Sequence, residues 1–397
     1  MISVEEARTR IIAGLAPVGA ETVALAAAHG RVLAVPVRAR VAHPPADVSA
    51  MDGYAVRAAD AVAGAQLRVI GEAPAGHPFA GGIGPGEAVR LFTGSFVPAG
   101  ADTILIQENA SAVPGGIIVN EMPAAGRHIR GRGQDFAVDD VLLPAHRRLT
   151  VRDIGLAAAG NHPWLTVFRR PRIAILSTGD EISLPGEIVG PGGIVNSNSA
   201  MLAAFVTACG GEAVVLPAAG DDAAAIAAAA EAARGVELLV TTGGASVGAH
   251  DLVQAGLGRQ GFALDFWKIA MRPGKPLIFG HVGALPVLGL PGNPVSAYVC
   301  ATLFLAPALA AMAGLPAAAP VFEVARLQGS LPANDVREDY LRARLSWQDG
   351  VLLAAAFAKQ DSAMLKPLAS ADALIRRPPF QAALADGDAV EIIRLGL

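Results

Sequence analysis

Cysteine is scarce in this chain, because Cys209 and Cys300 are the only two among 397 residues. Their spacing fits neither a disulfide framework nor a metal site, and such scarcity favours a reducing, cytoplasmic setting. Aromatic residues make up only 5% of the sequence, so the cores have to be built from Leu, Val, Ile and Ala. There is no basic block and the net charge is −4, which argues against non-specific nucleic-acid binding.

Two absences bear on membrane targeting. The first residues, MISVEE, are acidic and do not resemble a signal peptide. Residues 282–322 contain no charged side chain, and 296–314 are almost wholly apolar. Pro307 interrupts this run, alanine dominates it, and neither Lys nor Arg brackets it. The pattern therefore favours a buried helix of an α/β domain over a transmembrane span.

The stretch 241–251, TTGGASVGAHD, combines glycines, hydroxyl groups and a carboxylate that could together bind a ligand. It follows an apolar run, 236–240, that predicts a buried strand, and a helical pattern begins near Asp251. Its glycines let the backbone approach a ligand closely. A strand–loop–helix edge offers free N–H groups to an anion, and Asp251 could hold a hard cation. The alternative is an ordinary tight turn between a strand and a helix.

From Arg172 onward, predicted strands alternate with predicted helices, which indicates a parallel sheet with helices on both faces. The polar loops follow the strands, at the edge where such sheets bind ligands. Acids at 180, 181, 221, 222 and 251 and bases at 272 and 275 suggest Mg²⁺ beside a phosphate-like anion. Asp221 could instead be a helix N-cap. Residues 266–269 are expected to form a further strand.

Shorter apolar segments flank this region. Residues 67–70, 88–92, 103–107 and 116–119 predict a small β-rich domain, and 32–41 predicts a strand before it. A second β-domain, of a size that suits a barrel, is expected from 321 onward. Helices are predicted at 3–13, where Ser3 is the N-cap, and at 149–161. Asp52-Gly53 is a turn signal typical of a surface hairpin. Residues 129–135, IRGRGQD, suit an anion-contacting loop or a solvated turn.

Several of these motifs follow one another in an order that resembles the motif order of a known family. STGDE, TTGGASVGAHD, MRPGKP and GLPGNPVSA, with SAMDGYAV and IRGRGQD before them, resemble the MoeA family of molybdopterin molybdenumtransferases. The resemblance spans the chain and implies a multi-domain α/β and β protein. The expected parts are an N-terminal linker region at 1–170 with an inserted β-rich domain at about 45–134, a parallel-sheet molybdopterin-binding α/β domain at 171–315, and a C-terminal β-barrel at 320–397.

The resemblance also implies a reaction, in which molybdate enters adenylylated molybdopterin and AMP and the molybdenum cofactor are released. It implies a homodimer whose cleft is shared between subunits, and molybdopterin adenylyltransferase and molybdoenzymes as candidate partners. Catalytic roles are implied for Asp52, Glu181, Asp221, Asp251 and Lys275, and Glu181, Asp221 and Asp251 are the implied Mg²⁺ ligands. Substrate binding is implied for Thr93, Arg130, Asp135, Thr178, Gly243, Gly244, Ser246, Gly248, Arg272, Pro291, Asn293, Ser296, Arg342 and Ser362.

The chain departs from the family pattern at a few positions. Val48 replaces a usual Asn, Asp361 replaces a usual Gly before Ser362, and Arg272 is Lys in some members. Three other functions remain open at this point. One is molybdopterin adenylylation, the activity of single-domain relatives of the α/β part, and another is an anchoring scaffold. The third is a nucleotide- or molybdate-binding protein without turnover.

Overall fold

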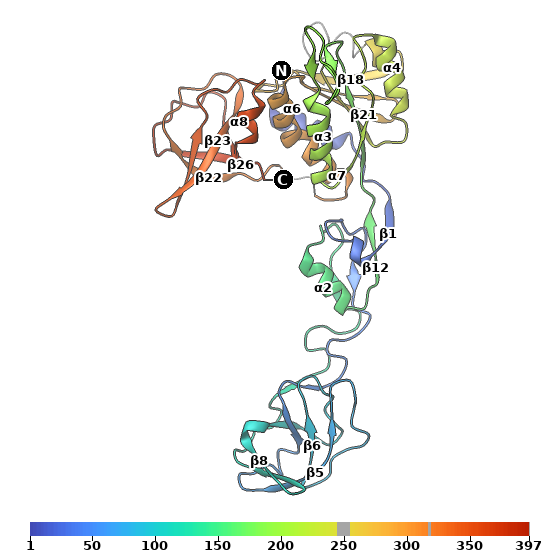
Figure 1. Cartoon of the computed structure of the whole chain (residues 1–397), viewed down its shortest axis with the longest axis vertical. Helices are drawn as coiled ribbons and strands as arrows, with labels where there is room; N and C mark the ends of the chain where they lie inside the picture. Colours follow the sequence, from blue (N-terminus) through green and yellow to red (C-terminus); the bar gives the residue numbers. More distant parts are fainter. Residues whose placement is uncertain (244–254, 317–318, 397) are drawn as a thin grey trace. The chain divides into compact units, whose positions relative to one another are not determined.

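The computed structural model describes residues 1–243, 255–316 and 319–396 (Figure 1). It divides into two compact units. The first unit comprises Met1–Glu21, Gly30–Ala34 and Val167–Leu397, and the second unit comprises Thr22–His29 and Val35–Thr166. The chain passes between them four times, within strands β1 (Ala20–Ala24) and β12 (Trp164–Phe168), after His29 and after Ala34. The predicted domain boundaries stay predictions.

The second unit contains a six-stranded sheet in the order β7-β4-β6-β5-β9-β8. Its strands are β4 (Gly53–Val56), β5 (Gln66–Ala73), β6 (Glu87–Leu91), β7 (Thr103–Ile106), β8 (Ala110–Val113) and β9 (Gly116–Val119). Neighbours such as Ala55 and Val56 belong to different buried clusters. Because successive side chains of a strand point to opposite faces, both faces of this sheet are covered. The β-rich domain expected from the sequence is confirmed.

The rest of the second unit is made of short elements. Helix α2 (Val151–Ala159) begins at a reciprocal capping box between Thr150 and Asp153, which confirms the helix predicted at 149–161. Two strand pairs join β2 (Val37–Arg38) to β11 (Val141–Leu143) and β3 (Val48–Ser49) to β10 (Ile129–Arg130). The 3₁₀ turns are Leu25–Ala27 and Gln107–Asn109. The strand predicted at 32–41 is shorter than expected, because Pro36 offers no N–H for a ladder.

The α/β part of the first unit contains a sheet in the order β16-β13-β17-β21-β20-β18. Its strands are β13 (Arg172–Ser177), β16 (Glu212–Val215), β17 (Leu238–Thr242), β18 (Phe262–Trp267), β20 (Ile278–Val282) and β21 (Leu285–Leu290). The first four in this order are parallel, as predicted, but β20 is antiparallel to both β21 and β18. Only Gly283 and Ala284 connect β20 to β21, and so short a connection makes a hairpin rather than a parallel crossover.

Helices cover both faces of this sheet, as predicted. Helix α4 (Ala223–Ala232) packs on one face through Ile226 and Ala230. The other face is covered by α1 (Val4–Ala13), α3 (Ser197–Ala208), α6 (Pro294–Cys300), a π-helical turn (Ala301–Leu305) and α7 (Ala306–Met312). Ser3 caps α1 by accepting a 3.0 Å hydrogen bond from the Glu6 amide. Within the described chain, Pro294–Met312 is the one helix long and apolar enough to cross a membrane, and 72% of its most apolar window is buried in the protein.

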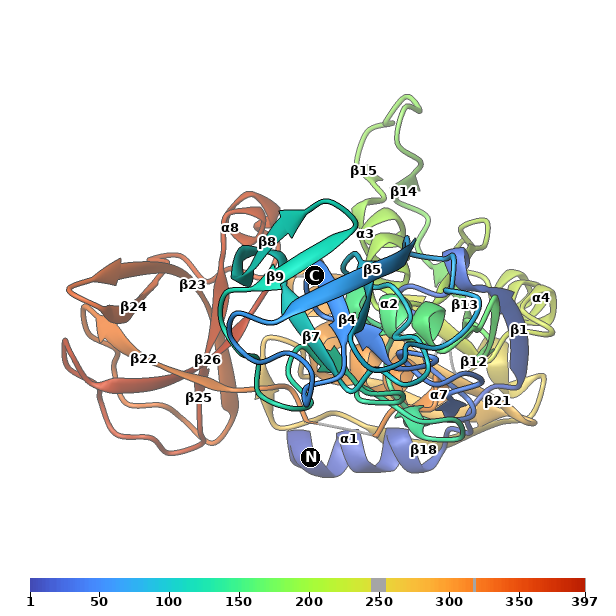
Figure 2. The ribbon, with the colours of Figure 1, turned by 90° about the horizontal axis from the view of Figure 1, so that it is seen from below.

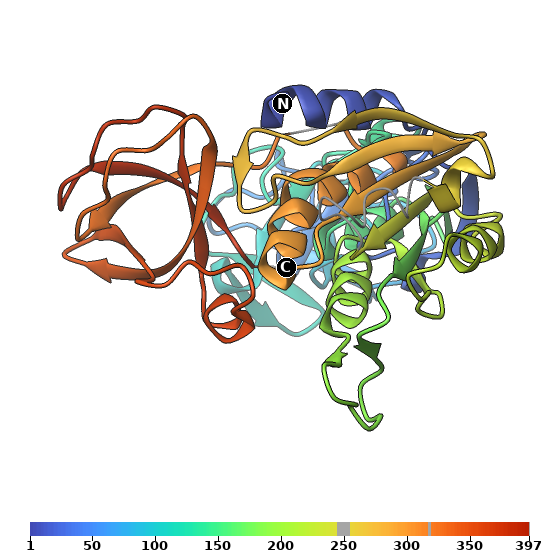
Figure 3. The same ribbon diagram turned by 90° about the horizontal axis from the view of Figure 1, so that it is seen from above.

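The C-terminal part of the first unit is a closed barrel, which confirms the barrel expectation (Figure 3). Its strands are β22 (Glu323–Gln328), β23 (Glu338–Gln348), β24 (Val351–Ala356), β25 (Ala373–Arg377) and β26 (Ala389–Arg394). Pairing of β23 with β25 closes the ring. Helix α8 (Leu365–Ala369) follows the 359–364 loop. Strand β19 (Met271–Arg272), which leaves the α/β part, pairs in parallel with β23.

One loop projects from the α/β part (Figure 2). It connects β14 (Ile182–Ser183) to β15 (Ile194–Val195), two short strands that pair in parallel. Leu184, Val189 and Ile194 are between 41% and 54% exposed, and Ile188 is 98% exposed. This projecting loop therefore presents apolar side chains with no covering partner in the described structure.

Candidate active site

The largest cavity described in the first unit has a volume of about 760 Å³ and lies at the carboxyl ends of β13, β17 and β21. Strand β18 runs in the same direction as β21, because both are antiparallel to β20, so its following loop reaches the same edge. This strand-end cavity is lined by nine residues predicted for the site: Thr178, Glu181, Gly243, Arg272, Lys275, Pro291, Asn293, Ser296 and Ser362. The expected convergence of polar loops at this edge is confirmed.

Close backbone packing shapes the floor of the strand-end cavity. Gly243 has a φ of +91°, and a Cβ there would lie 2.3 Å from the Thr178 carbonyl oxygen. Only glycine fits this position without strain. Asn198 of α3 donates to the Thr242 hydroxyl at 2.8 Å and to the Gly292 carbonyl at 2.7 Å. The sequence interpretation missed Asn198, although the run NSNS at the start of a helix after a strand was an available signal.

Asn293 and Ser362 meet although 69 positions separate them. Asn293 is the N-cap of α6 and donates from Nδ2 to the Ser362 hydroxyl at 2.8 Å. The Ser362 carbonyl accepts from the Val295 amide at 3.0 Å. A loop that follows the barrel strand β24 therefore caps a helix of the α/β part and completes one wall of the strand-end cavity.

Arg342 is not among the residues that line the cavity, and its predicted role in substrate binding stays a prediction. Its side chain is 1% exposed and donates to the carbonyls of Lys359, Asp361 and Met364 at 2.9–3.1 Å and to Gln360 at 3.3 Å. Burial lowers the pKa of its guanidinium, and the charge of Asp361 opposes that shift. The donors of Arg342 are thus used to hold the 359–364 loop, which in turn carries Ser362 into the cavity wall.

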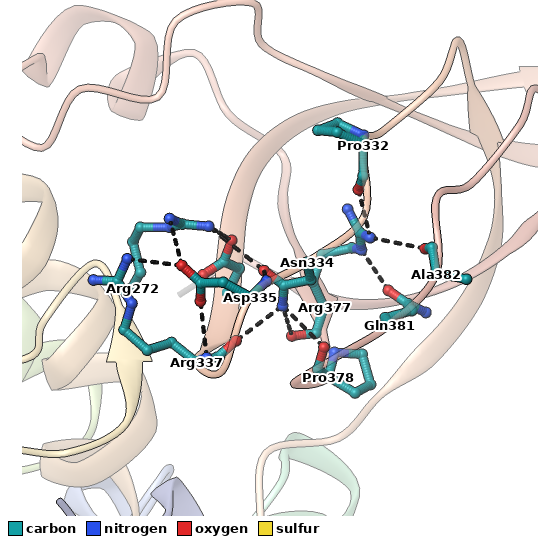
Figure 4. Close-up of polar contacts among 10 residues, drawn as sticks. Arg272, Pro332, Asn334, Asp335, Arg337, Arg377, Pro378, Gln381 and Ala382 are labelled. Atoms are coloured by element: carbon teal, nitrogen blue, oxygen red, sulfur yellow. Dashed lines mark hydrogen bonds and ion pairs between the residues drawn. The ribbon is translucent and has the colours of Figure 1, made fainter.

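Arg272 and Lys275 lie on one loop but have different surroundings. Arg272 donates to Asp335 at 3.3 Å and forms a closer ion pair with Asp339 (Figure 4). Its pKa is raised, mainly by the hydrogen bond to Asp339. The Lys275 side chain is exposed, lines the cavity, and has no ion-pair partner among the residues that the structure describes. Lys275 is therefore the freer of the two predicted anion-binding cations.

Arg337 is a further cation at the cavity that the sequence interpretation missed. It donates to Asp335 at 3.0 Å, so Asp335 lies between Arg272 and Arg337 (Figure 4). These contacts lower the pKa of Asp335 to about 2, chiefly through the hydrogen bonds from Arg337. The barrel thereby adds a positive charge to the wall opposite the sheet edge.

The predicted acidic cluster is only partly assembled. Glu181 lines the strand-end cavity, whereas Asp221 is not among its lining residues. The Asp221 amide donates to Asp180 at 2.9 Å. Asp222, rather than Asp221, caps α4 by accepting from the Ala225 amide at 2.8 Å. The proposal that Asp221 caps the helix is therefore wrong by one residue, because the helix begins at Ala223.

The implied Mg²⁺ ligands can be tested only in part. Within residues 1–243, 255–316 and 319–396, no group of three or more His, Cys, Asp or Glu side chains could hold a metal ion. This finding concerns only sites built from three or more such side chains, whereas Mg²⁺ is commonly held by one or two carboxylates together with substrate phosphates, so the implied Mg²⁺ ligands stay a prediction. Four predicted site residues, Gly244, Ser246, Gly248 and Asp251, lie outside the described residues.

The remaining predicted residues lie in the second unit. Asp52 accepts from the amide and the hydroxyl of Thr93 at 2.7 and 2.9 Å, and these bonds lower its pKa, with a smaller contribution from Arg90. Gly53 begins β4, which pairs with β6 and β7, whereas the preceding strand β3 pairs with β10, so Asp52-Gly53 does not join a hairpin. A Cβ at Gly53 would lie 2.2 Å from the Leu105 carbonyl oxygen, which explains the glycine. The turn interpretation of Asp52-Gly53 is thus wrong.

Arg130 and Asp135 line a separate cavity of about 590 Å³ within the second unit. Its walls also include His43, Pro44, Val48 and Phe96. The side chain of Arg130 is exposed and has no ion-pair partner in the described part of the chain. This arrangement agrees with an anion-contacting role for IRGRGQD, which stays a prediction.

Comparison with known families gives three matches along the chain. Residues 2–160 match the MoeA N-terminal region (domain I and II), residues 174–311 match a probable molybdopterin binding domain, and residues 324–395 match the MoeA C-terminal region (domain IV).

Individual relatives match over nearly the full length. A molybdopterin molybdenumtransferase of Nostoc sp. is 34% identical over 94% of this chain and 88% of its own. A molybdopterin molybdenumtransferase 2 of Mycobacterium tuberculosis is 34% identical over 94% of both chains. A crystal structure of the molybdopterin biosynthesis MoeA protein from Pyrococcus horikosii covers 100% of both chains with a TM-score of 0.88 and 29% identity.

Proposed function

This chain belongs to the MoeA family of molybdopterin molybdenumtransferases, and from that premise we propose that it inserts molybdate into adenylylated molybdopterin, with release of AMP and the finished cofactor. The observation that carries the proposal is the strand-end cavity of about 760 Å³, on whose wall Lys275 has no ion-pair partner among the described residues. A cavity of that size is typical of small-molecule sites.

The chemistry of the cavity wall suits the reactants. Molybdate and the phosphates of the adenylylated substrate are anions that accept hydrogen bonds from a cation such as Lys275. The sulfur atoms that bind molybdenum belong to the substrate, so the protein needs no thiol at the site. Neither cysteine lines the cavity, and complete burial raises the pKa of Cys300.

We test the proposal by turnover. The purified protein, adenylylated molybdopterin and molybdate should together yield AMP and a product that activates a cofactor-free molybdoenzyme. Adenylylated molybdopterin formed from molybdopterin and ATP would instead establish the adenylyltransferase reaction. Binding of both substrates without AMP release would establish a binding protein or scaffold.

We further propose a homodimer with a shared active cleft. Two observations support it. The predicted residues fall into two sets, one around Asp52 and Arg130 in the second unit and one around Lys275 in the first unit. The projecting loop, whose flanking residues Ile182 and Ile194 line the cavity, also exposes the adjacent apolar side chains of Ile188 and Val189, and an exposed apolar patch is typical of a surface that another chain covers. The adenylyltransferase of the preceding step and acceptor molybdoenzymes are the proposed transient partners, and the cytoplasm is the proposed location.

Magnesium remains a prediction. Of the two predicted ligands that the structure describes, Glu181 lines the cavity and Asp221 does not, and we propose that Asp251 joins Glu181 in holding the ion. If bound, Mg²⁺ would polarise the phosphoanhydride.

A further inference from the structure

Two buried polar atoms at the strand-end cavity have no hydrogen-bond partner among the residues that the structure describes. They are the Oγ1 of Thr178, a residue that is 2% exposed, and the Oδ1 of Asn198, a residue that is 9% exposed. Both residues line the cavity. Leaving a buried polar group without a partner is costly, and such groups in native proteins call for an explanation. A ligand that supplies the missing partner is one such explanation.

The orientation of the Asn198 amide is determined by its neighbours. Its nitrogen donates to the Thr242 hydroxyl and to the Gly292 carbonyl at 2.8 and 2.7 Å. The Thr242 hydroxyl in turn donates a hydrogen bond to the Pro291 carbonyl at 3.2 Å. A flipped amide would place an oxygen against the Gly292 carbonyl, where neither atom could donate. The unpartnered atom is therefore an oxygen, and it can only accept a hydrogen bond.

Because Asn198 Oδ1 can only accept a hydrogen bond, it can bind only those parts of the substrate that carry N–H or O–H donors. Molybdate and ionised phosphate offer only acceptor oxygens, so neither can satisfy Asn198 Oδ1. The pterin and adenine rings of adenylylated molybdopterin carry amino groups, and the pterin also carries ring N–H groups. Resting on the proposed function, we propose that Asn198 and Thr178 form a subsite for the N–H donors of an amino-substituted ring of the substrate. The anionic groups then extend toward Lys275.

Two threonine variants separate this binding role from a structural one. Thr178→Val removes a hydroxyl that has no partner, so its unfolding midpoint should equal or exceed that of the wild type. Thr242→Val is the matched control on the neighbouring strand. It removes the acceptor for Asn198 and the donor to Pro291, so its midpoint should fall. A fall for Thr178→Val as large as that for Thr242→Val would overturn the subsite.

Binding is measured by calorimetry with three separate probes: pterin, AMP and molybdate. Thr178→Val and Asn198→Ala should weaken one of the two ring-containing probes by roughly three- to ten-fold, the factor expected for one neutral hydrogen bond. Molybdate affinity should not change. Weaker binding of pterin alone identifies the pterin ring, and weaker binding of AMP alone identifies adenine.

Two outcomes overturn the inference. One is unchanged affinity of both rings in Thr178→Val, a variant that is expected to fold even if Asn198→Ala does not. The other is a loss confined to molybdate. Failure of the proposed function is distinguishable, because the wild type would then release no AMP from adenylylated molybdopterin whatever the two variants do to ring binding.

Discussion

Lys275 and Arg272 are only three positions apart, but we expect them to have different roles. Single replacements should show that Lys275 binds the anion and that Arg272 holds the barrel against the α/β part. The structure leaves the Lys275 ammonium without an ion-pair partner in the described chain, whereas Arg272 pairs with Asp335 and Asp339. Lys275→Ala should therefore impair anion binding and leave stability unchanged. Arg272→Ala should chiefly lower stability.

The two magnitudes follow from different causes. A charge-assisted hydrogen bond contributes roughly 1.5–3 kcal/mol, which corresponds to about ten- to a hundred-fold in affinity for the anion that Lys275 holds. Removing one partner of a fully buried ion pair costs roughly 3–5 kcal/mol. The Asp339 side chain is 6% exposed but that of Arg272 is 46% exposed, so solvent screening reduces the expected cost to about 1–3 kcal/mol.

The assays are urea unfolding and a molybdate titration of AMP release at saturating adenylylated substrate. Asp339→Asn added to Arg272→Ala is the control, because a neutral buried side chain needs no cation and part of the lost stability should return. The reasoning is refuted if Lys275→Ala gives a molybdate curve that superimposes on that of the wild type and binds AMP equally well. It is also refuted if Arg272→Ala loses anion affinity at unchanged stability.

Four further predictions follow from individual contacts. The contacts of Asp335 with Arg337 and Arg272 lower its pKa from 3.8 to about 2. The stabilisation from these contacts is therefore present above about pH 4 and is lost as the pH falls through about 2. The difference in unfolding midpoint between wild type and Asp335→Asn should vanish over that range. Arg342→Met should speed hydrogen exchange in the 359–364 loop and weaken AMP binding, whereas unchanged exchange would deny that Arg342 holds the loop. Mixing Asp52→Ala with Lys275→Ala subunits, at a molybdate concentration where neither variant alone turns over, should restore activity at one of the two sites in each heterodimer, and no recovery after verified subunit exchange would contradict a shared cleft. Asp251→Ala should strongly reduce AMP release and raise the Mg²⁺ requirement, and equal turnover at every Mg²⁺ concentration would remove Asp251 from the mechanism.

Local pattern was sufficient wherever the cause of structure is itself local. The capping residue Ser3 predicted the start of α1, and apolar segments predicted β5, β6, β7 and β9. Strands followed by polar loops also predicted which edge of the sheet holds the cavity, because the carboxyl ends of parallel strands must meet at one edge. The antiparallel pair β18–β20 was missed, since strand direction depends on a partner that local pattern does not specify.

Motif order determined the family and the residue types of the site. It placed Thr178, Gly243, Lys275 and Asn293 among the candidates, and the structure places all four around one cavity. The same reasoning could not assign each charge to its partner. Asp221 and Asp222 are both acidic and adjacent, and only the start of α4 at Ala223 decides that Asp222 is the cap.

The charge and type of each side chain were determined by the sequence, but its partner was decided by the tertiary structure. Arg272 pairs with Asp339, 67 positions away, and Arg342 is enclosed by the backbone of the 359–364 loop. A guanidinium uses the same N–H donors for an anion and for a backbone carbonyl. The presence of an arginine in the sequence therefore does not reveal which of these two acceptors it contacts. Which of these it contacts depends on packing between the α/β part and the barrel. Among the residues that the structure describes, Lys275 has no ion-pair partner and Asn198 Oδ1 accepts no hydrogen bond, and neither result could be assigned from the sequence.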